Sequence, residues 1–426
     1  MNLLLILTVS FNLGCHKDVV IPIPTSTPCN FGLCDTSIIE IVWQRPLSID
    51  TTEWISVPAV LNTNDVLFCR CTFDAGSDTL KLFDSRSGNL KNTWADYLHP
   101  SPASPSNIFL SGGKFIYGIW DDVYTIDATS LTSFMKSRVF NGTGLPRINV
   151  QGGYIYHTHN GKDIYSSSAS NLVRSKIDIL KWDTIFTQNK IDNYVPNIER
   201  SSIWVDTKGN SVALFQIRYV EFGTATSRDR TDFVAYNITQ KQIYFRFNEI
   251  DSFKTGSIEY PYIYGNNAYV TLTRSIYCFD LINKKIKWSK TMLPGETFSG
   301  AEPFLMVENK LYLKPDNNTL YSLNPETGEQ IWVDTNAGVG NYGMFYNNGI
   351  LYYTCDGSGT IVALDLATRK KIWNEPSPNK YPNKFNGNRR FNNANIGFGG
   401  IAIDSAAGLL YTSDFYFGMC LKLPKK

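Results

Sequence analysis

The sequence alternates short apolar runs with polar turns, and one spacing recurs along it. An Asp or Asn closes an alternating apolar run, and a Trp or Phe stands eight residues later in the next run. The pairs are Asn237 with Phe245, Asp280 with Trp288, Asn324 with Trp332, and Asp365 with Trp373. The successive Asp or Asn markers lie 43, 44 and 41 residues apart, and a fixed period in this range is typical of propeller blades. The pattern therefore predicts an all-β fold built from repeated blades of four antiparallel strands.

The unit around Asn324 indicates why this turn recurs. The Asn324 side chain can accept hydrogen bonds from backbone N–H groups two residues further on, and Gly328 can take the left-handed conformation that closes the loop. Trp332 then stands in the outermost strand, where a large flat side chain would fill the wedge between diverging blades. We therefore expect the tryptophans at this position to pack between blades rather than to stack on a ligand.

Earlier parts of the chain continue the repeat. Asp84 and Asp127 mark two units that lie 43 residues apart. The 110 residues from Asp127 to Asn237 predict two longer units. The first runs over about 147–186 with Trp182 outermost, and the second over about 202–247 with an insertion near 221–232.

The last unit lacks one strand at its own end. After Trp373, the segments 399–403, 409–411 and 419–423 supply only three strands. The run from Ile38 to Trp43 reads as an outer strand without a blade, and its pairing with the last unit would remove an exposed sheet edge. The sequence thus predicts an eight-bladed β-propeller closed by its N-terminal strand.

Residues 1–15 indicate a secretory signal that ends at a lipidation site. The apolar run from Leu3 to Phe11 is too short to span a bilayer. Gly14-Cys15 then resembles the bacterial lipobox, in which the cysteine is lipidated and becomes the mature N-terminus. The expected layout is a signal at 1–15, a flexible tether at 16–37 and the propeller at 38–426. We expect a lipoprotein of the bacterial cell envelope, attached through Cys15 to the outer membrane on its periplasmic or surface face.

Neither the net charge nor the histidine and cysteine pairs identify a function class. The 40 basic and 38 acidic residues leave a formal net charge of +2, which gives no argument for a nucleic-acid partner. His157 and His159 share one strand face, as do Cys69 and Cys71, but neither pair has further ligands at a fixed spacing. We expect hydrogen-bonded imidazoles and buried thiols here, and no metal site.

Three of the units resemble the PQQ-like, or quinoprotein-type, β-propeller repeat. They are the segments 276–288, 320–332 and 361–373, and the resemblance covers most of residues 38–426. Arg369 stands where this motif usually has a glycine. The family includes pyrroloquinoline-quinone dehydrogenases, a lipoprotein of the outer-membrane β-barrel assembly machinery, and many envelope lipoproteins without an assigned activity. The resemblance implies the architecture and carries over no catalytic residue.

Two function classes follow. The first is a non-catalytic, envelope-anchored binding or scaffold propeller that engages a protein or glycan partner through one face. The second is a PQQ-dependent quinoprotein dehydrogenase, which needs a cofactor in the central channel, a calcium ion with oxygen ligands and a carboxylate base. Dehydrogenases of the family also stack a pair of adjacent cysteines on the cofactor, and this sequence contains no adjacent cysteines. The binding protein is therefore favoured, as a monomer without a cofactor.

One segment is the candidate partner surface. Between Glu375 and Asp404 there is no acidic residue, and basic and amide side chains alternate with aromatic ones. Loops that enter the innermost strand of a blade lie at the mouth of the central channel, where they can present donors to an anionic or polar partner. The candidate contacts are Arg389, Arg390, Asn392, Asn393 and Asn395. A solvated insertion that only lengthens one connection is the other interpretation.

Overall fold

The computed structural model describes most of the chain after the expected tether. The described residues are 38–47, 60–70, 78–96, 108–119, 122–138, 147–159, 168–221, 230–251, 260–272, 274–298, 303–340, 342–355, 359–379, 401–414 and 417–424. Their regular structure consists of β-strands. Among these residues, no helix is long and apolar enough to cross a membrane.

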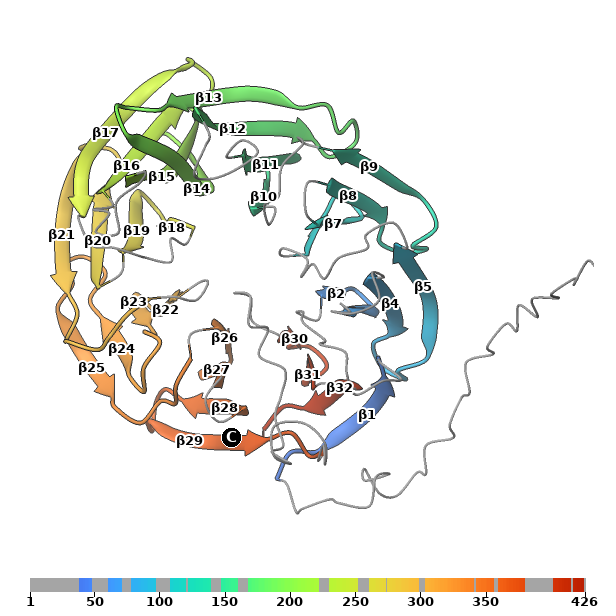
Figure 1. The fold of residues 1–426 in the computed structure, drawn as a ribbon. Helices are drawn as coiled ribbons and strands as arrows, with labels where there is room; N and C mark the ends of the chain where they lie inside the picture. Colours follow the sequence, from blue (N-terminus) through green and yellow to red (C-terminus); the bar gives the residue numbers. More distant parts are fainter. Residues whose placement is uncertain are drawn as a thin grey trace, which may run out of the picture.

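The strands form eight separate four-stranded antiparallel sheets arranged as blades in a ring (Figure 1). We number the blades from the first complete sheet, and each strand order runs from the centre of the ring outward.

Blades 1 to 4 consist of β2 (Val60–Asn62), β3 (Asp65–Arg70), β4 (Asp78–Asp84) and β5 (Leu90–Asp96); β6 (Phe109–Ser111), β7 (Lys114–Ile119), β8 (Asp122–Asp127) and β9 (Phe134–Arg138); β10 (Arg147–Gln151), β11 (Tyr154–His159), β12 (Ala169–Lys176) and β13 (Asp183–Asn189); and β14 (Tyr194–Val205), β15 (Ser211–Glu221), β16 (Arg230–Asn237) and β17 (Gln242–Asp251).

Blades 5 to 8 consist of β18 (Tyr262–Tyr264), β19 (Asn267–Leu272), β20 (Ser275–Asp280) and β21 (Lys285–Thr291); β22 (Phe304–Val307), β23 (Lys310–Leu313), β24 (Leu320–Leu323) and β25 (Gln330–Asp334); β26 (Tyr342–Asn347), β27 (Ile350–Cys355), β28 (Thr360–Asp365) and β29 (Lys370–Pro376); and β30 (Ala402–Asp404), β31 (Leu409–Ser413), β32 (Phe417–Lys422) and β1 (Ile41–Pro46).

The N-terminal strand closes the ring, as predicted. In Figure 1, β1 (blue) lies beside β32 (red), and the two strands pair antiparallel with Trp43 opposite Cys420. The Trp43 indole is 5% exposed and donates its N–H to the Ser85 carbonyl of blade 1, at 2.9 Å. The Arg45 guanidinium also donates to the Gly88 carbonyl at 2.7 Å. One strand therefore completes blade 8 and joins it to blade 1.

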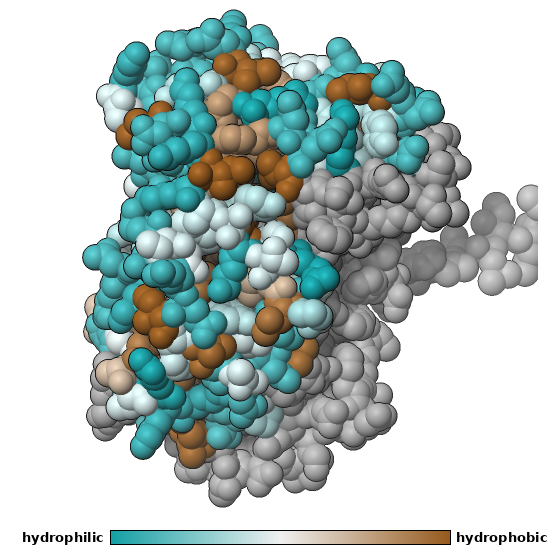
Figure 2. Space-filling view, turned by 90° about the vertical axis from the view of Figure 1, so that its left-hand side faces the viewer, coloured by the Kyte–Doolittle hydropathy of each residue, from teal (hydrophilic) through white to brown (hydrophobic). Residues whose placement is uncertain are grey.

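The hydrophobic core lies between the blades. Each of the eight clusters of buried apolar residues combines side chains from two neighbouring blades. In β28, Ile361 and Ala363 belong to the cluster with blade 8, and Val362 and Leu364 to the cluster with blade 6. A middle strand is therefore apolar on both faces, because each face packs on a different sheet. The outer strands are more polar, and the coloured part of Figure 2 shows mainly hydrophilic residues with hydrophobic ones scattered among them.

The turn between the third and fourth strands follows the predicted chemistry. The Asn324 side chain accepts a hydrogen bond from the Glu326 N–H at 2.8 Å, and Gly328 has a φ of 72°. The equivalent residue is left-handed in all seven blades whose third and fourth strands are joined by a turn, although only two of the seven are glycines. The set is Gly88, Leu131, Leu180, Lys241, Lys284, Gly328 and Arg369. Arg369, which replaces the usual glycine of the motif, has a φ of 60° and places its guanidinium over the Trp332 ring, 5.7 Å from the centroid.

The predicted start of blade 4 is wrong. Its innermost strand begins at Tyr194 rather than near residue 202, and its four strands are 8 to 12 residues long. The extra part contains Asn197 and Glu199, which are both buried and joined by a hydrogen bond of 2.7 Å. Polar residues that satisfy each other inside a strand interrupt the apolar alternation, so that the sequence reads as a loop. Residues 222–229, which form most of the predicted insertion, lie outside the described part of the chain, and its two ends belong to β15 and β16.

Candidate functional site

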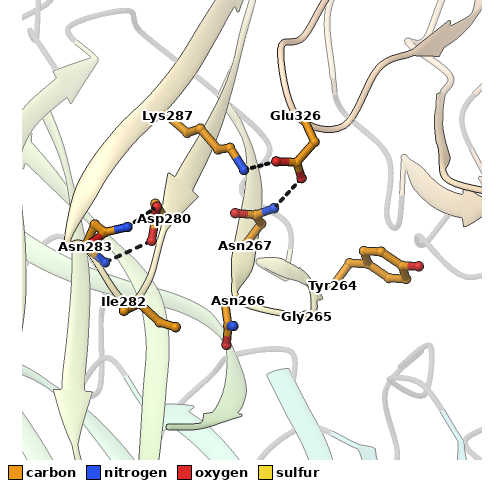
Figure 3. Close-up of a pocket in the computed structure, with 9 residues that line it drawn as sticks. All are labelled: Tyr264, Gly265, Asn266, Asn267, Asp280, Ile282, Asn283, Lys287 and Glu326. Atoms are coloured by element: carbon orange, nitrogen blue, oxygen red, sulfur yellow. Dashed lines mark hydrogen bonds and ion pairs between the residues drawn. The ribbon is translucent and has the colours of Figure 1, made fainter. Parts of the chain in front are cut away.

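A cleft of about 370 Å³, lined mostly by residues with polar side chains, lies between blades 5 and 6. It opens at the face of the ring where the first strand of a blade turns into the second and the third into the fourth. Nine residues line it, namely Tyr264, Gly265, Asn266, Asn267, Asp280, Ile282, Asn283, Lys287 and Glu326 (Figure 3). Eight of them come from blade 5, and Glu326 comes from the turn after β24 in blade 6.

The turn after β20 forms one side of the cleft. Asp280 accepts hydrogen bonds from the Asn283 backbone N–H at 2.9 Å and from the Asn283 side-chain amide at 2.7 Å. Burial alone would raise the pKa of Asp280, but these hydrogen bonds and the nearby Lys285 ammonium hold that pKa below its usual value. The Asp280 carboxylate is therefore charged near neutral pH and is committed to shaping the turn. Ile282, in the same turn, is 43% exposed.

The other side of the cleft joins the two blades. Lys287 of β21 forms an ion pair with Glu326, and the Asn267 amide donates to the same carboxylate at 3.3 Å. In Figure 3 these three side chains form one group, whereas Asp280 and Asn283 form a second group beside it. Each carboxylate of the cleft therefore already has protein partners.

A tryptophan of blade 5, Trp288, packs against the blade 6 turn that carries Glu326. The Trp288 indole donates its N–H to the Pro325 carbonyl at 2.9 Å, and the Tyr269 hydroxyl donates to the same oxygen at 3.3 Å. The Trp288 ring packs against Gly328 so closely that a Cβ built on Gly328 would lie 2.7 Å from Trp288 Cδ2. The predicted role of these tryptophans, packing between blades, is confirmed here. The contact fixes the turn that carries Glu326.

The lining of the cleft suits reversible binding. It contains amides, two carboxylates, one ammonium and an exposed tyrosine, and it includes no serine, cysteine or histidine. This lining therefore contains no thiol or imidazole nucleophile, and its one side-chain hydroxyl is the phenol of Tyr264. What the cleft offers is a fixed arrangement of hydrogen-bond donors and acceptors.

A buried lysine lies elsewhere in blade 6. Lys314, which follows β23, is 1% exposed and donates to the carbonyls of Gly338 at 2.6 Å and Asn317 at 3.3 Å. Its ammonium also lies 5.8 Å from the Tyr353 ring centroid. Burial lowers the pKa of Lys314 to about 8. The side chain is enclosed, so we assign it to the packing of blades 6 and 7.

The paired histidines occupy a structural position. His157 is buried in β11 and packs edge-on against Trp182, with 6.2 Å between the ring centroids. Burial lowers the pKa of His159, which favours a neutral imidazole. Within the described ranges, no group of three or more His, Cys, Asp or Glu side chains could hold a metal ion. Three cysteines, Cys278, Cys355 and Cys420, are buried as free thiols.

The residues that the sequence singled out for anchoring and partner binding lie outside the described part of the chain. They are Cys15, Arg389, Arg390, Asn392, Asn393 and Asn395, and their roles stay predictions. Cys71 and the side chain of Cys69 lie outside it as well. The sequence reasoning did not identify the cleft. Its only local signal is the accumulation of Asn266, Asn267 and Asn283 in two turns of one blade.

Comparisons with known proteins agree with this fold. The family model described as outer membrane protein assembly factor BamB matches residues 234–389 and 316–410. BamB from Moraxella catarrhalis superposes with a TM-score of 0.54 at 9% identity, over 91% of this chain and 100% of that one. Sqt1 from Saccharomyces cerevisiae gives 0.60 at 9% identity, over 88% and 97%. The computationally designed protein Ika8 gives 0.56 at 10%, over 89% and 99%.

No curated protein matches the sequence. At these identities the solved structures establish the fold alone. The family match covers residues 234–410, and it supports repeats of the PQQ-like β-propeller type in this part of the chain.

Proposed function

We propose that the protein is a non-catalytic binding or scaffold propeller, anchored in the bacterial cell envelope, which engages a protein or glycan partner through one face. The observation that carries this proposal is the cleft between blades 5 and 6, because its carboxylates are already bound by protein groups and its lining presents mainly hydrogen-bond donors and acceptors. The match to a model of an outer-membrane assembly factor supports an envelope location.

The proposed anchor is a lipid on Cys15. Residues 16–37 would serve as a tether that lets the ring reach a partner away from the membrane. The chain would act as a monomer, because the N-terminal strand already closes the ring and covers the sheet edge of blade 8. Replacing Cys15 with Ala should release the protein from the membrane fraction without changing its melting temperature.

The proposed partner surface includes Arg389, Arg390, Asn392, Asn393 and Asn395. These residues lie in the sequence between β29 and β30, and the described ends of those two strands are at the face opposite the cleft. Exposed basic side chains attract an anionic or polar partner but contribute little to stability. The partner surface and the cleft would then be separate regions of one scaffold.

A pull-down from native envelope with the full-length chain tests the binding function. The wild type should capture a defined partner, and the Arg389→Ala/Arg390→Ala variant should capture less of it with a similar melting temperature. Equal capture by this variant would show that the partner surface lies elsewhere.

A second assay tests the absence of catalysis. After incubation with pyrroloquinoline quinone and Ca²⁺, the protein should not reduce an artificial dye with alcohols or sugars as substrates. Dye reduction clearly above a control without protein would refute the non-catalytic assignment and favour the dehydrogenase.

A further inference from the structure

The cleft between blades 5 and 6 combines a polar floor with an exposed aromatic ring. Asn266 is exposed, and within the described residues its side-chain amide makes no hydrogen bond to protein. Lys287 has three N–H donors, of which Glu326 takes one. Tyr264 and Ile282 add apolar surface that is 45% and 43% exposed. In Figure 3, Asn266 and Ile282 lie below the two hydrogen-bonded groups, and the Tyr264 ring extends away to the right.

The charges of the cleft are largely compensated before any ligand arrives. The Lys287 ammonium faces the Glu326 carboxylate, and Asp280 is held by Asn283. An anionic ligand would find one ammonium that is already paired and would be repelled by two carboxylates. The groups that can still donate and accept are therefore mostly neutral amides, which favour a neutral ligand with many hydroxyl groups.

The backbone around the cleft is fixed in advance. Gly265, in the turn between β18 and β19, has a φ of 59°, and Lys284, in the turn between β20 and β21, has a φ of 54°. The hydrogen bonds accepted by Asp280 close the second of these turns. The Lys284 ammonium lies 3.9 Å from the Tyr244 ring centroid in blade 4, which fixes the far side of this turn. A site whose backbone is already ordered loses less conformational entropy on binding, so modest contacts can give measurable affinity.

We propose that this cleft is a carbohydrate-binding site for a neutral sugar unit, with Asn266 and Lys287 contacting hydroxyl groups and the Tyr264 ring packing on the apolar face of the sugar ring. The inference rests on the proposed binding function and names a ligand class for the cleft. A volume of about 370 Å³ falls at the small end of the range for small-molecule sites. The site would take a short oligosaccharide or the end of a longer glycan.

Saturation-transfer difference NMR with the full-length protein tests this inference. The probes are cellotriose, maltotriose and the trimer of N-acetylglucosamine, with trigalacturonate as the charged comparison and a blocked tetrapeptide as the comparison for protein partners. At least one neutral trisaccharide should receive saturation from the wild type. Tyr264→Ala and Asn266→Ala should each weaken that binding at least about tenfold, which corresponds to about 1.4 kcal/mol.

Tyr346→Ala is the matched control variant. Tyr346 is also an exposed tyrosine, at 38%, but its hydroxyl bonds Glu308 at 2.8 Å between blades 6 and 7, outside the cleft. This variant should bind the probe as the wild type does. Equal loss in Tyr346→Ala, no transfer to any neutral probe, or preferential transfer to trigalacturonate or the peptide would each overturn the carbohydrate assignment.

The outcome is separable from that of the proposed function. If the neutral probes fail while the wild type still captures an envelope partner, the ligand class of the cleft is wrong and the binding scaffold stands. If a probe binds and is lost in the Tyr264 and Asn266 variants while no envelope partner is captured, the cleft assignment stands and the partner surface on the opposite face is wrong.

Discussion

Replacing Gly328 with Ala should destabilise the propeller far more than the same change at an open turn. Gly328 has a φ of 72°, and an alanine in this left-handed region costs about 1–2 kcal/mol. The new Cβ would also lie 2.7 Å from Trp288 Cδ2, so the indole must move. Overpacking of this kind costs about 1–3 kcal/mol. Loss of the 2.9 Å hydrogen bond from the indole to Pro325 adds about 0.5–1.5 kcal/mol.

Together these effects predict a loss of about 3–6 kcal/mol in the free energy of unfolding. Gly209→Ala is the matched control, because Gly209 has a φ of 79° but an added Cβ would meet no atom within 4 Å. It should cost only the backbone term of about 1–2 kcal/mol. Urea unfolding followed by circular dichroism measures both variants.

A double-mutant cycle isolates the contact with the indole. In a Trp288→Ala background the steric conflict is gone, and Gly328→Ala should then cost no more than Gly209→Ala. If Gly328→Ala costs as little as Gly209→Ala in the wild type, or loses the same free energy with and without Trp288, the packing of the tryptophan on the turn does not hold the blades together.

Two further predictions concern the closure of the ring and the buried lysine. Deleting residues 38–46 should lower the melting temperature strongly, since it removes β1 and with it Trp43, a buried residue whose loss alone should cost about 3–5 kcal/mol; unchanged stability would contradict closure by this strand. For Lys314, the folded pKa of about 8 lies below the unfolded value near 10.5, so the unfolded state binds more protons between these pH values and wild-type stability should rise with pH relative to Lys314→Met. The difference should grow by up to about 3 kcal/mol across that window, and parallel pH curves for the two proteins would show that Lys314 is not desolvated.

The sequence predicted the number of blades because the turn chemistry repeats with them. The Asp or Asn side chain at the end of the third strand accepts hydrogen bonds from backbone N–H groups of the turn. Because each such turn needs this residue type, Asp or Asn recurs in the sequence at a nearly constant spacing. The closing strand was predictable for a related reason. A ring that lacked the fourth strand of its last blade would expose a sheet edge, and the run ending at Trp43 was an apolar segment that followed the signal-like region and belonged to no predicted blade.

The same reasoning failed where tertiary contacts replace a local rule. The motif's glycine is absent at Arg369, yet the backbone is left-handed there with a φ of 60°. The guanidinium lies over the Trp332 ring, and the Lys284 ammonium lies over Tyr244 in the equivalent turn of blade 5. Contacts between a cation and an aromatic ring contribute about 0.5–1 kcal/mol at exposed sites, which offsets part of the backbone cost. The sequence around Arg369 and Lys284 does not indicate that each side chain contacts an aromatic ring of the preceding blade.

The cleft shows why a binding site in a propeller is harder to predict than the fold. Lys287 and Glu326 are 39 positions apart, and their contact depends on how the turn of blade 6 is staggered against the outer strand of blade 5. That stagger is set by Trp288, whose indole bonds Pro325 next to Glu326. The tryptophan that reveals the repeat therefore also positions the carboxylate that pairs with Lys287, so Gly328→Ala should weaken binding of a neutral trisaccharide as well as stability. A variant that loses stability but retains full probe binding would separate the packing of the blades from the geometry of the cleft.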